Sequence, residues 1–275
     1  MTRDQRPDAK RRHGDTETRV ILFTGKGGVG KTSIAAATAA RAARSGRRTL
    51  LVSSDLAHNL ADVFDVKLDQ GEAMIGEHLH LLEVDVLAEI REHWAGMQSY
   101  LTDFLAYLGV DSVVAEEVAL FPGVDEVFLL TRILREIEGG EYDLVVMDCA
   151  PTAGTLRLLT FTDSASSKLN KLMEVERMIL KLVRPIGRRF KNFKAIIPDD
   201  EVYETLGEVI ADIGRLGEIL KDPEHASVRL VLNPDPIAVA ETRRSFTYFA
   251  LFGFPVDAVC VNKLLPAELE DGWFQ

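Results

Sequence analysis

The amino-acid sequence predicts an α/β protein with a doubly wound, mostly parallel sheet. Short, near-continuous apolar runs recur along the chain, as is typical of parallel strands that helices cover on both faces. Between these runs lie stretches with apolar residues at every third or fourth position, which is the spacing of amphipathic helices. A glycine-rich loop joins the first apolar run to the first helical stretch. Such alternation of strands and helices favours crossover connections and therefore parallel strands.

Length and composition are those of one soluble globular domain: 275 residues, of which 47% are hydrophobic and 27% charged. The formal net charge of -11 argues against a general binder of nucleic acid or anionic membranes, so we expect no nucleic-acid partner. Cys149 and Cys260 both lie in apolar stretches, which excludes a disulfide framework and indicates the cytoplasm. No apolar run approaches the roughly 18 residues that span a bilayer, so any membrane association is expected to be peripheral.

Residues 23–33 form the glycine-rich loop and match the pattern G-x-x-x-x-G-K-[ST]. The loop follows an apolar strand and precedes an alanine-rich helix, which is the context that a phosphate-binding loop requires. Its glycines allow successive N–H groups to turn inward, while Lys31 reaches the β- and γ-phosphates and the Thr32 hydroxyl ligates Mg2+. The residues expected to contact the nucleotide here are Gly25, Lys26, Gly27, Gly28, Val29, Gly30, Lys31, Thr32 and Ser33.

Lys26 is a second lysine, at the tip of the same loop. With two positive charges a few residues apart, at least one must find negative charge outside its own loop. A nucleotide bound to a partner subunit is the natural candidate, and a solvated surface lysine is the alternative.

The N-terminal residues 1–18 are polar with mixed charge and are expected to form a disordered tail before a single domain at residues 19–275. The first helix is expected to end near Arg44, and a buried strand at 49–54 to follow. Asp55 ends that strand, where its carboxylate could orient the water that attacks the γ-phosphate; a helix N-cap is the alternative role.

Two more strands and two helices are expected in the middle of the chain. A strand at residues 80–84 precedes a helical stretch from about 86 to 108, and a further helix ends near Ile137. The apolar strand at 142–148 ends in Asp148, which is the Walker B arrangement and would hold Mg2+ through water.

Residues 149–155 form a flexible loop that could respond to the loss of the γ-phosphate. The following segment, about 161–222, has no strand-like run and reads as a helical insert, with a methionine-containing apolar stripe, a basic cluster at 184–194 and a closing helix at 199–221. The stripe suits a groove for apolar client segments, and equally a subdomain that buries its own stripe or a dimer face.

The sheet resumes with a strand at 227–233, and Asp235 lies between two prolines at the start of a helix that runs to about residue 251. The last strand, 256–261, leads to Asn262, whose side-chain amide can both donate to and accept from a base edge.

Five motifs occur in order along the chain: Gly-Lys-Gly-Gly-Val-Gly-Lys-Thr-Ser, Asp-x-Ala-His, Pro-Gly-Val-Asp-Glu, Asp-x-Ala-Pro-Thr-x-x-Thr-Leu-Arg-Leu-Leu and Val-Asn-Lys-Leu-Leu-Pro. With them the chain resembles, over residues 19–266, the ArsA family of deviant Walker A P-loop ATPases. That family holds arsenite-pump ATPases and ATPases that target tail-anchored membrane proteins. The resemblance implies Mg-dependent ATP hydrolysis by a homodimer that sandwiches two nucleotides.

The resemblance also implies roles for single residues. Lys26 would reach the nucleotide of the facing subunit, Asp55 would activate the attacking water, and Asp148 would be the metal residue of the second switch segment. Asp235 and Asn262 fall where family members contact the sugar and the base.

Departures from the family pattern bear on switch timing more than on binding: Leu56 stands for a Pro, Cys149 for a Thr, Ala153-Gly154 for Gly-His, and Asp235 for a Glu. Arsenite binding is disfavoured because the pump's manner of holding it needs three thiols, and no zinc is expected because the Cys-x-x-Cys motif is absent. Family members continue for several tens of residues, so the sheet is expected to be incomplete at its C-terminal end; either the chain is truncated or another polypeptide completes the sheet.

The hypothesis that follows is an ATP-hydrolysing dimeric switch coupled to a client, which would be a hydrophobic membrane-protein segment or the anion-pump machinery. The alternative is a nucleotide-dependent scaffold with little turnover, similar to ParA and MinD. The basic cluster at 184–194 is the best support for that alternative.

Overall fold

The computed structural model describes most of the chain between the ends, and the description that follows is restricted to residues 18–53, 60–69, 71–84, 124–150, 155, 159 and 200–264. Several sequence expectations lie outside these residues: the N-terminal tail, Asp55, the helix at 86–108 and the part of the helical insert at 161–199.

The described strands form one seven-stranded sheet in the order β3-β4-β2-β5-β1-β6-β7. Its strands are β1 Arg19–Gly25, β2 Thr49–Ser53, β3 Glu72–Ile75, β4 Leu79–Glu83, β5 Leu144–Asp148, β6 Ala226–Leu232 and β7 Val256–Val261. Every neighbouring pair is parallel except β3 and β4, which are antiparallel. The predicted mostly parallel α/β sheet is therefore confirmed, and the antiparallel edge strand β3 is an addition to it.

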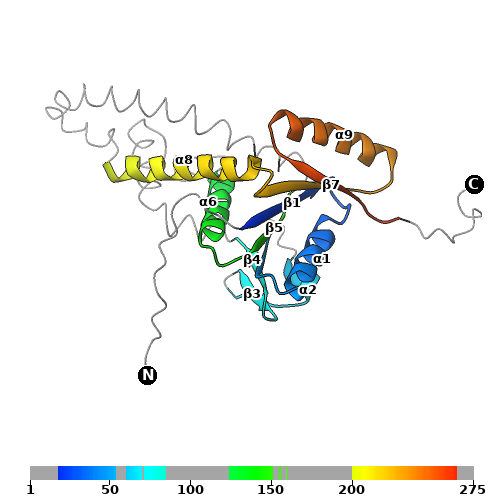
Figure 1. Ribbon diagram of the computed structural model, residues 1–275, viewed down its shortest axis with the longest axis horizontal. Helices are drawn as coiled ribbons and strands as arrows, with labels where there is room; N and C mark the ends of the chain where they lie inside the picture. Colours follow the sequence, from blue (N-terminus) through cyan, green and yellow to red (C-terminus); the bar gives the residue numbers. More distant parts are fainter. Residues whose placement is uncertain are drawn as a thin grey trace, which may run out of the picture.

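Helices cover both faces of the sheet, as Figure 1 shows, with α1 and α2 on one side and α8 and α9 on the other. The described helices are α1 Lys31–Arg44, α2 Leu60–Phe64, α6 Val124–Glu138, α8 Asp200–Lys221 and α9 Pro236–Leu251. Alternate residues of β1 serve the two layers: Leu22 packs with α6, α8 and α9, whereas Phe23 packs with α1 and α2. This two-sided burial explains the continuous apolar run of β1.

The C-terminal half of α8 belongs to the core of this domain. Ile213, Leu216 and Leu220 are buried, and the last two pack in the layer that α6 and α9 also line. The closing helix predicted at 199–221 is thus confirmed as a helix, and its end packs on the sheet.

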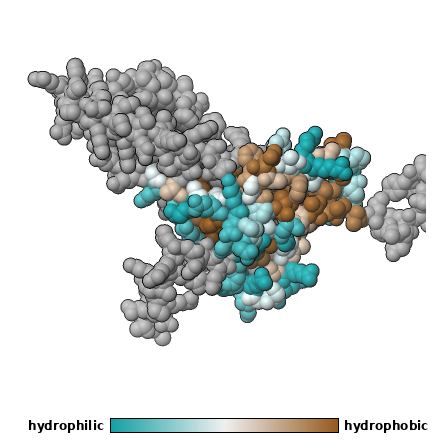
Figure 2. Space-filling model, turned by 45° about the horizontal axis from the view of Figure 1, so that its top comes forward, coloured by the Kyte–Doolittle hydropathy of each residue, from teal (hydrophilic) through white to brown (hydrophobic). Residues whose placement is uncertain are grey.

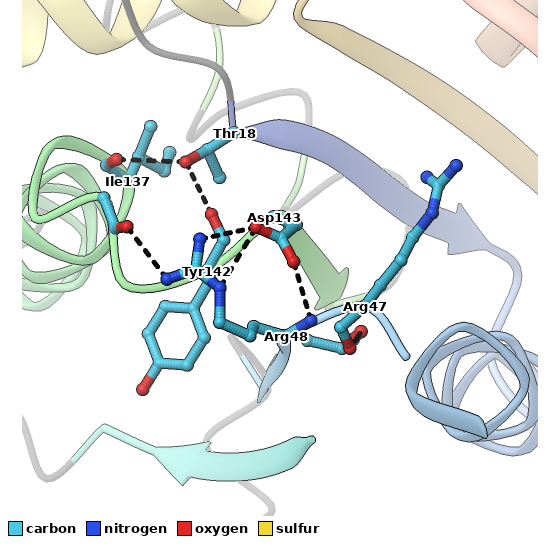
Figure 3. A network of polar contacts seen from close by, with 8 residues as sticks. Thr18, Arg47, Arg48, Ile137, Tyr142 and Asp143 are labelled. Carbon is cyan, nitrogen blue, oxygen red and sulfur yellow. Dashed lines mark hydrogen bonds and ion pairs between the residues drawn. The ribbon is translucent and has the colours of Figure 1, made fainter. Parts of the chain in front are cut away.

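The amino ends of the central strands are joined by polar contacts on the side away from the glycine loop (Figure 3). Thr18 Oγ1 donates to the carbonyl of Tyr142 at 2.8 Å, next to the start of β5. The Arg48 guanidinium donates to Asp143 at 2.5 and 3.1 Å, and the Arg48 backbone N–H donates to the same carboxylate at 2.9 Å. The Arg48 hydrogen bond lowers the pKa of Asp143 below its usual value.

β7 is an edge strand of the described sheet, with β6 as its neighbour there. Val259 and Val261 are 50% and 45% exposed. Figure 2 shows apolar surface gathered on the part of the molecule that carries α9 and β7, whereas the surface below it is mostly hydrophilic. The large apolar side chains exposed on α9 and just after it are Ile237, Phe246, Tyr248, Leu251 and Phe252.

Candidate functional site

The glycine loop begins where β1 meets β6. Gly25 is the last residue of β1, and a Cβ built on it would lie 2.1 Å from the backbone oxygen of Val231. No other residue fits so close to a neighbouring strand, so Gly25 lets β1 run alongside β6 up to the loop.

The far side of the loop is open. Gly27 and Gly28 are exposed, and a Cβ on either would meet nothing within 4 Å. Gly28 and Gly30 adopt positive φ angles of 76° and 89°, a region that residues with a Cβ rarely occupy. The loop therefore combines a backbone that needs glycine with space into which a ligand can approach.

Helix α1 starts from this loop with an uncapped N-terminus. Gly30 is the N-cap residue, no side chain caps the helix, and the first turn contains no acidic residue. The first N–H groups of α1 and the positive end of its dipole thus remain available to an anion.

Two lysines contribute positive charge at the same place. Lys31 is only 8% exposed, and its ammonium lies 3.5 Å from the backbone oxygen of Lys26. Lys26 is half-buried, and within the residues that the structure describes neither lysine forms an ion pair with a carboxylate. Their charge is therefore not neutralised by that part of the chain, which suits a phosphate group.

A buried carboxylate lies on the adjacent strand. Asp148 ends β5 in register with Phe23 of β1 and with Ser53 of β2, and it is 2% exposed. Thr32 is in the first turn of α1, so the chain brings a hydroxyl and a carboxylate to the carboxyl end of the central strands. Oxygen donors of these two kinds fit Mg2+.

The strand under the loop is also linked to the segment that follows Asp148. Thr155 is 1% exposed; its hydroxyl donates to the carbonyl of Ala150 at 2.7 Å and lies 3.0 Å from the Thr24 hydroxyl of β1. Cys149 donates its backbone N–H to the carbonyl of Phe23 at 3.0 Å. A shift of Cys149 or Thr155 would therefore act directly on β1, whereas the rest of the loop predicted at 149–155, residues 151–154, lies outside the described residues.

Asn262 lies beside the glycine loop, as expected from its place after β7. Its Nδ2 donates to the carbonyl of Val29 at 2.8 Å, which leaves Oδ1 as the acceptor that could face a base. Asp235 is the N-cap of α9 and accepts from the N–H of Ala238 at 2.8 Å. A contact of Asp235 with a nucleotide sugar remains a prediction.

A family model described as anion-transporting ATPase matches residues 18–275. This chain belongs to that ArsA family. The P-loop geometry above is thus found in a family whose description names an ATPase.

Curated relatives of this ArsA-family chain are consistent with the match. A putative arsenical pump-driving ATPase of Chlorobaculum tepidum is 40% identical over 94% of this chain and 64% of its own length. A putative arsenical pump-driving ATPase 1 of Aquifex aeolicus is 34% identical over 91% of this chain and 64% of its own length. The ATPase GET3 of Phaeosphaeria nodorum is 29% identical over 90% of this chain and 77% of its own length. The chain therefore spans just under two thirds of the length of the two pump-driving relatives.

Glu83 is a residue of this ArsA-family site that the sequence interpretation did not identify. Its Oε1 accepts from the N–H groups of Leu60 and Ala61, at 2.7 and 3.2 Å, and so holds the start of α2. Because α2 follows the segment that contains Asp55, Glu83 anchors the far end of that segment. The available signal was an acid at the end of an apolar strand, the same signal that marked Asp148.

Among the described residues of this ArsA-family chain, no helix is both long and apolar enough to cross a membrane. Nor do three or more His, Cys, Asp or Glu side chains gather among them as a metal-binding group.

Proposed function

We propose that this chain is an ATPase that binds ATP with Mg2+ on the glycine loop and hydrolyses its γ-phosphate. The observation that carries the proposal is the uncapped, acid-free N-terminus of α1 behind an open loop of glycines. The names of the relatives, which are ATPases, support the same reaction.

Each residue has a separate task in this proposal. Lys31 neutralises charge on the β- and γ-phosphates, and the N–H groups from Gly28 to Thr32 orient them. Thr32 and Asp148 would hold Mg2+, which neutralises phosphate oxygens when bound. Asp55 positions the attacking water, since phosphoryl transfer asks mainly for positioning and charge stabilisation.

The functional unit in this proposal is a homodimer with the nucleotides between the subunits. Lys26 supports it, because its ammonium has no acidic partner within the described part of its own chain. Residues 149–155 would carry the nucleotide state through Thr155 to β1 and to a client. The client would be a hydrophobic membrane-protein segment or the anion-pump machinery, and the setting the cytoplasm with peripheral contact to a membrane.

Steady-state ATP turnover with and without Mg2+ tests the enzymatic part. We expect turnover that requires Mg2+ and that falls at least about 100-fold in Lys31→Ala and Asp55→Asn. Lys67→Ala is a matched control, because Lys67 is exposed and lies outside the phosphate loop, between α2 and β3. If the protein has no Mg-dependent turnover, the ATPase proposal fails; tight ATP binding without turnover would favour the ParA- and MinD-like scaffold.

The client is tested separately. A hydrophobic transmembrane peptide should co-purify with the protein in an ATP-dependent manner, and a scrambled polar peptide should not. Equal recovery with and without ATP would reject a nucleotide-controlled client site.

A further inference from the structure

Two consecutive residues after β7 hold two consecutive carbonyl groups of the glycine loop. Asn262 Nδ2 donates to the carbonyl of Val29 at 2.8 Å, and Lys263 Nζ donates to the carbonyl of Gly28 at 2.7 Å. The backbone N–H of Asn262 also donates to Leu232 at 2.8 Å, so this pair of side chains extends from the hydrogen-bonded end of the sheet. The contact joins parts of the chain more than 230 residues apart.

The local backbone adapts to these contacts on both sides. Lys263 has a φ of 54°, the left-handed region that is unfavourable for a residue with a Cβ. Gly30 has a φ of 89°, and a Cβ on it would lie 2.4 Å from Asn262 Nδ2, so a larger residue would be strained and would displace the amide. Lys263 keeps a strained φ where it contacts Gly28, and Gly30 packs closely against the Asn262 amide that contacts Val29. These two features indicate a fixed arrangement rather than a chance approach of a long side chain.

The geometry of the peptide bond shows what the contacts fix. In a trans peptide the C=O and the following N–H point in opposite directions. Holding the Gly28 carbonyl toward Lys263 therefore turns the N–H of Val29 away from the end of β7. Holding the Val29 carbonyl toward Asn262 does the same for the N–H of Gly30.

We propose that Lys263 is a positioning residue of the phosphate loop, which together with Asn262 presets the N–H groups of Val29 and Gly30 toward the phosphates. The inference deepens the proposed ATP site and rests on it. A preset loop binds phosphate without first ordering its own backbone. The contact of the Lys263 ammonium with the Gly28 carbonyl, here called the latch, therefore lowers the entropic cost of binding. The positive charge of Lys263 also stays close to the loop, although its ammonium already donates to the Gly28 carbonyl.

Substitutions at position 263 can distinguish the effect of the ammonium from the effect of the left-handed backbone conformation. Lys263→Met keeps most of the chain length and removes the donor, and Lys263→Arg restores a cationic donor. Lys263→Gly suits the φ of 54° better than lysine does, so it keeps the turn and removes the latch without destabilising the fold. Lys67→Met is the charge-matched control on an exposed site.

The first measurement uses full-length protein without nucleotide. Hydrogen–deuterium exchange of the segment 26–32 should be at least about fivefold faster in Lys263→Met and Lys263→Gly than in wild type, and unchanged in Lys67→Met. Unchanged exchange in both Lys263 variants would overturn the proposal. Since no nucleotide is present, this result stands even if wild type binds no ATP, which would refute the proposed function alone.

The second measurement is affinity. For MgADP and MgATP, we expect Kd to rise about tenfold in both variants, kcat at saturating ATP to stay within about twofold, and Lys263→Arg to recover most of the loss. The rise should persist at 0.5 M salt, because a positioning effect is not screened as a long-range charge effect is. A loss of affinity that disappears at high salt, or tighter binding by the variants, would contradict the positioning role.

Discussion

The side-chain amide of Asn262 lies directly against the α-carbon of Gly30, where a Cβ would be 2.4 Å from Nδ2. Gly30 is also the N-cap of α1 and has a φ of 89°. Glycine is therefore favoured at this position of the P-loop motif for two reasons, its backbone angle and the closeness of the Asn262 amide. Through Asn262, the end of β7 is hydrogen-bonded to the loop that starts α1.

Gly30→Ala should be among the most damaging substitutions in the loop. The left-handed φ costs alanine about 1–2 kcal/mol, and the Asn262 amide must move away as well, so we expect a loss of about 2–3 kcal/mol in the free energy of unfolding. Urea unfolding followed by circular dichroism measures this loss.

Gly27→Ala is the matched control. Gly27 does not have a positive φ, and a Cβ there would meet nothing within 4 Å. Its free energy of unfolding should stay within about 0.5 kcal/mol of wild type. Equal losses in the two variants would show that the Asn262 contact and the positive φ do not matter.

The strands and the phosphate loop could be predicted from the sequence because their signals are local. The final strand, 256–261, has in the structure the bounds that its apolar run predicts, and Asp148 ends β5 as expected. The short strand β3 was not predicted, because Glu72–Ile75 is only four residues long and lies at the edge of the described sheet, where it pairs with β4. Local patterns show which longer apolar runs form strands, but not which short segment pairs with the edge of an existing sheet.

The contacts of Lys263 with the loop and of Glu83 with α2 could not be predicted from the sequence, for a different reason. Lys263 reads as a solvated lysine, and only its positive φ together with the approach of β7 to the loop brings its ammonium to Gly28. Glu83 likewise contacts backbone N–H groups 22 and 23 residues earlier in the chain. Contacts between a side chain and a distant backbone leave no pattern of residue types that a single sequence reveals.

The Arg48–Asp143 pair predicts a pH-dependent contribution to stability. Its hydrogen bonds lower the pKa of Asp143 in the folded state, so the stabilisation is present above the unfolded pKa, near 4, and is lost as the pH falls through the lower folded pKa. Both side chains are about half exposed. Asp143→Asn should therefore cost only about 1 kcal/mol at pH 7, with the difference from wild type shrinking below about pH 4. Urea midpoints at pH 7, 5 and 3.5 measure it.

Asp212 provides a control of opposite sign. Burial raises its pKa despite the ion pair with Arg215, so ionised Asp212 opposes folding and wild type gains stability as the pH falls through the raised pKa. Asp212→Asn should be neutral or slightly stabilising at pH 7. A loss at Asp212 as large as that at Asp143 would contradict the assignment of burial as the dominant cause.

Glu83→Ala should destabilise the start of α2. The variant leaves the N–H groups of Leu60 and Ala61 without their acceptor, which should cost about 2 kcal/mol in the free energy of unfolding. Glu77→Ala, at an exposed position, should change it by less than about 0.5 kcal/mol. Because Asp55 lies in the segment that Glu83 anchors, ATP turnover should fall more than ATP affinity in Glu83→Ala. Equal falls would place Glu83 in binding instead.

Lys26 carries the most specific prediction about assembly. If its ammonium acts on the nucleotide of the facing subunit, Lys26→Ala should lose hydrolysis and keep ATP affinity within about threefold of wild type, whereas Lys31→Ala should lose both. A Lys26→Ala protein that hydrolyses ATP normally would remove the basis for the sandwich dimer.

Mixing two inactive variants distinguishes action across the dimer from action within one subunit. In a mixed dimer of Lys26→Ala and Asp148→Asn, the first subunit keeps Asp148 and receives Lys26 from the second, so one of the two sites is complete. With free exchange of subunits, half of the dimers are mixed, and about a quarter of wild-type turnover should return. If Lys26 instead serves the nucleotide of its own subunit, every site in the mixture lacks one residue and no turnover returns. A single ATPase assay therefore distinguishes the two arrangements, because turnover returns in one and stays absent in the other.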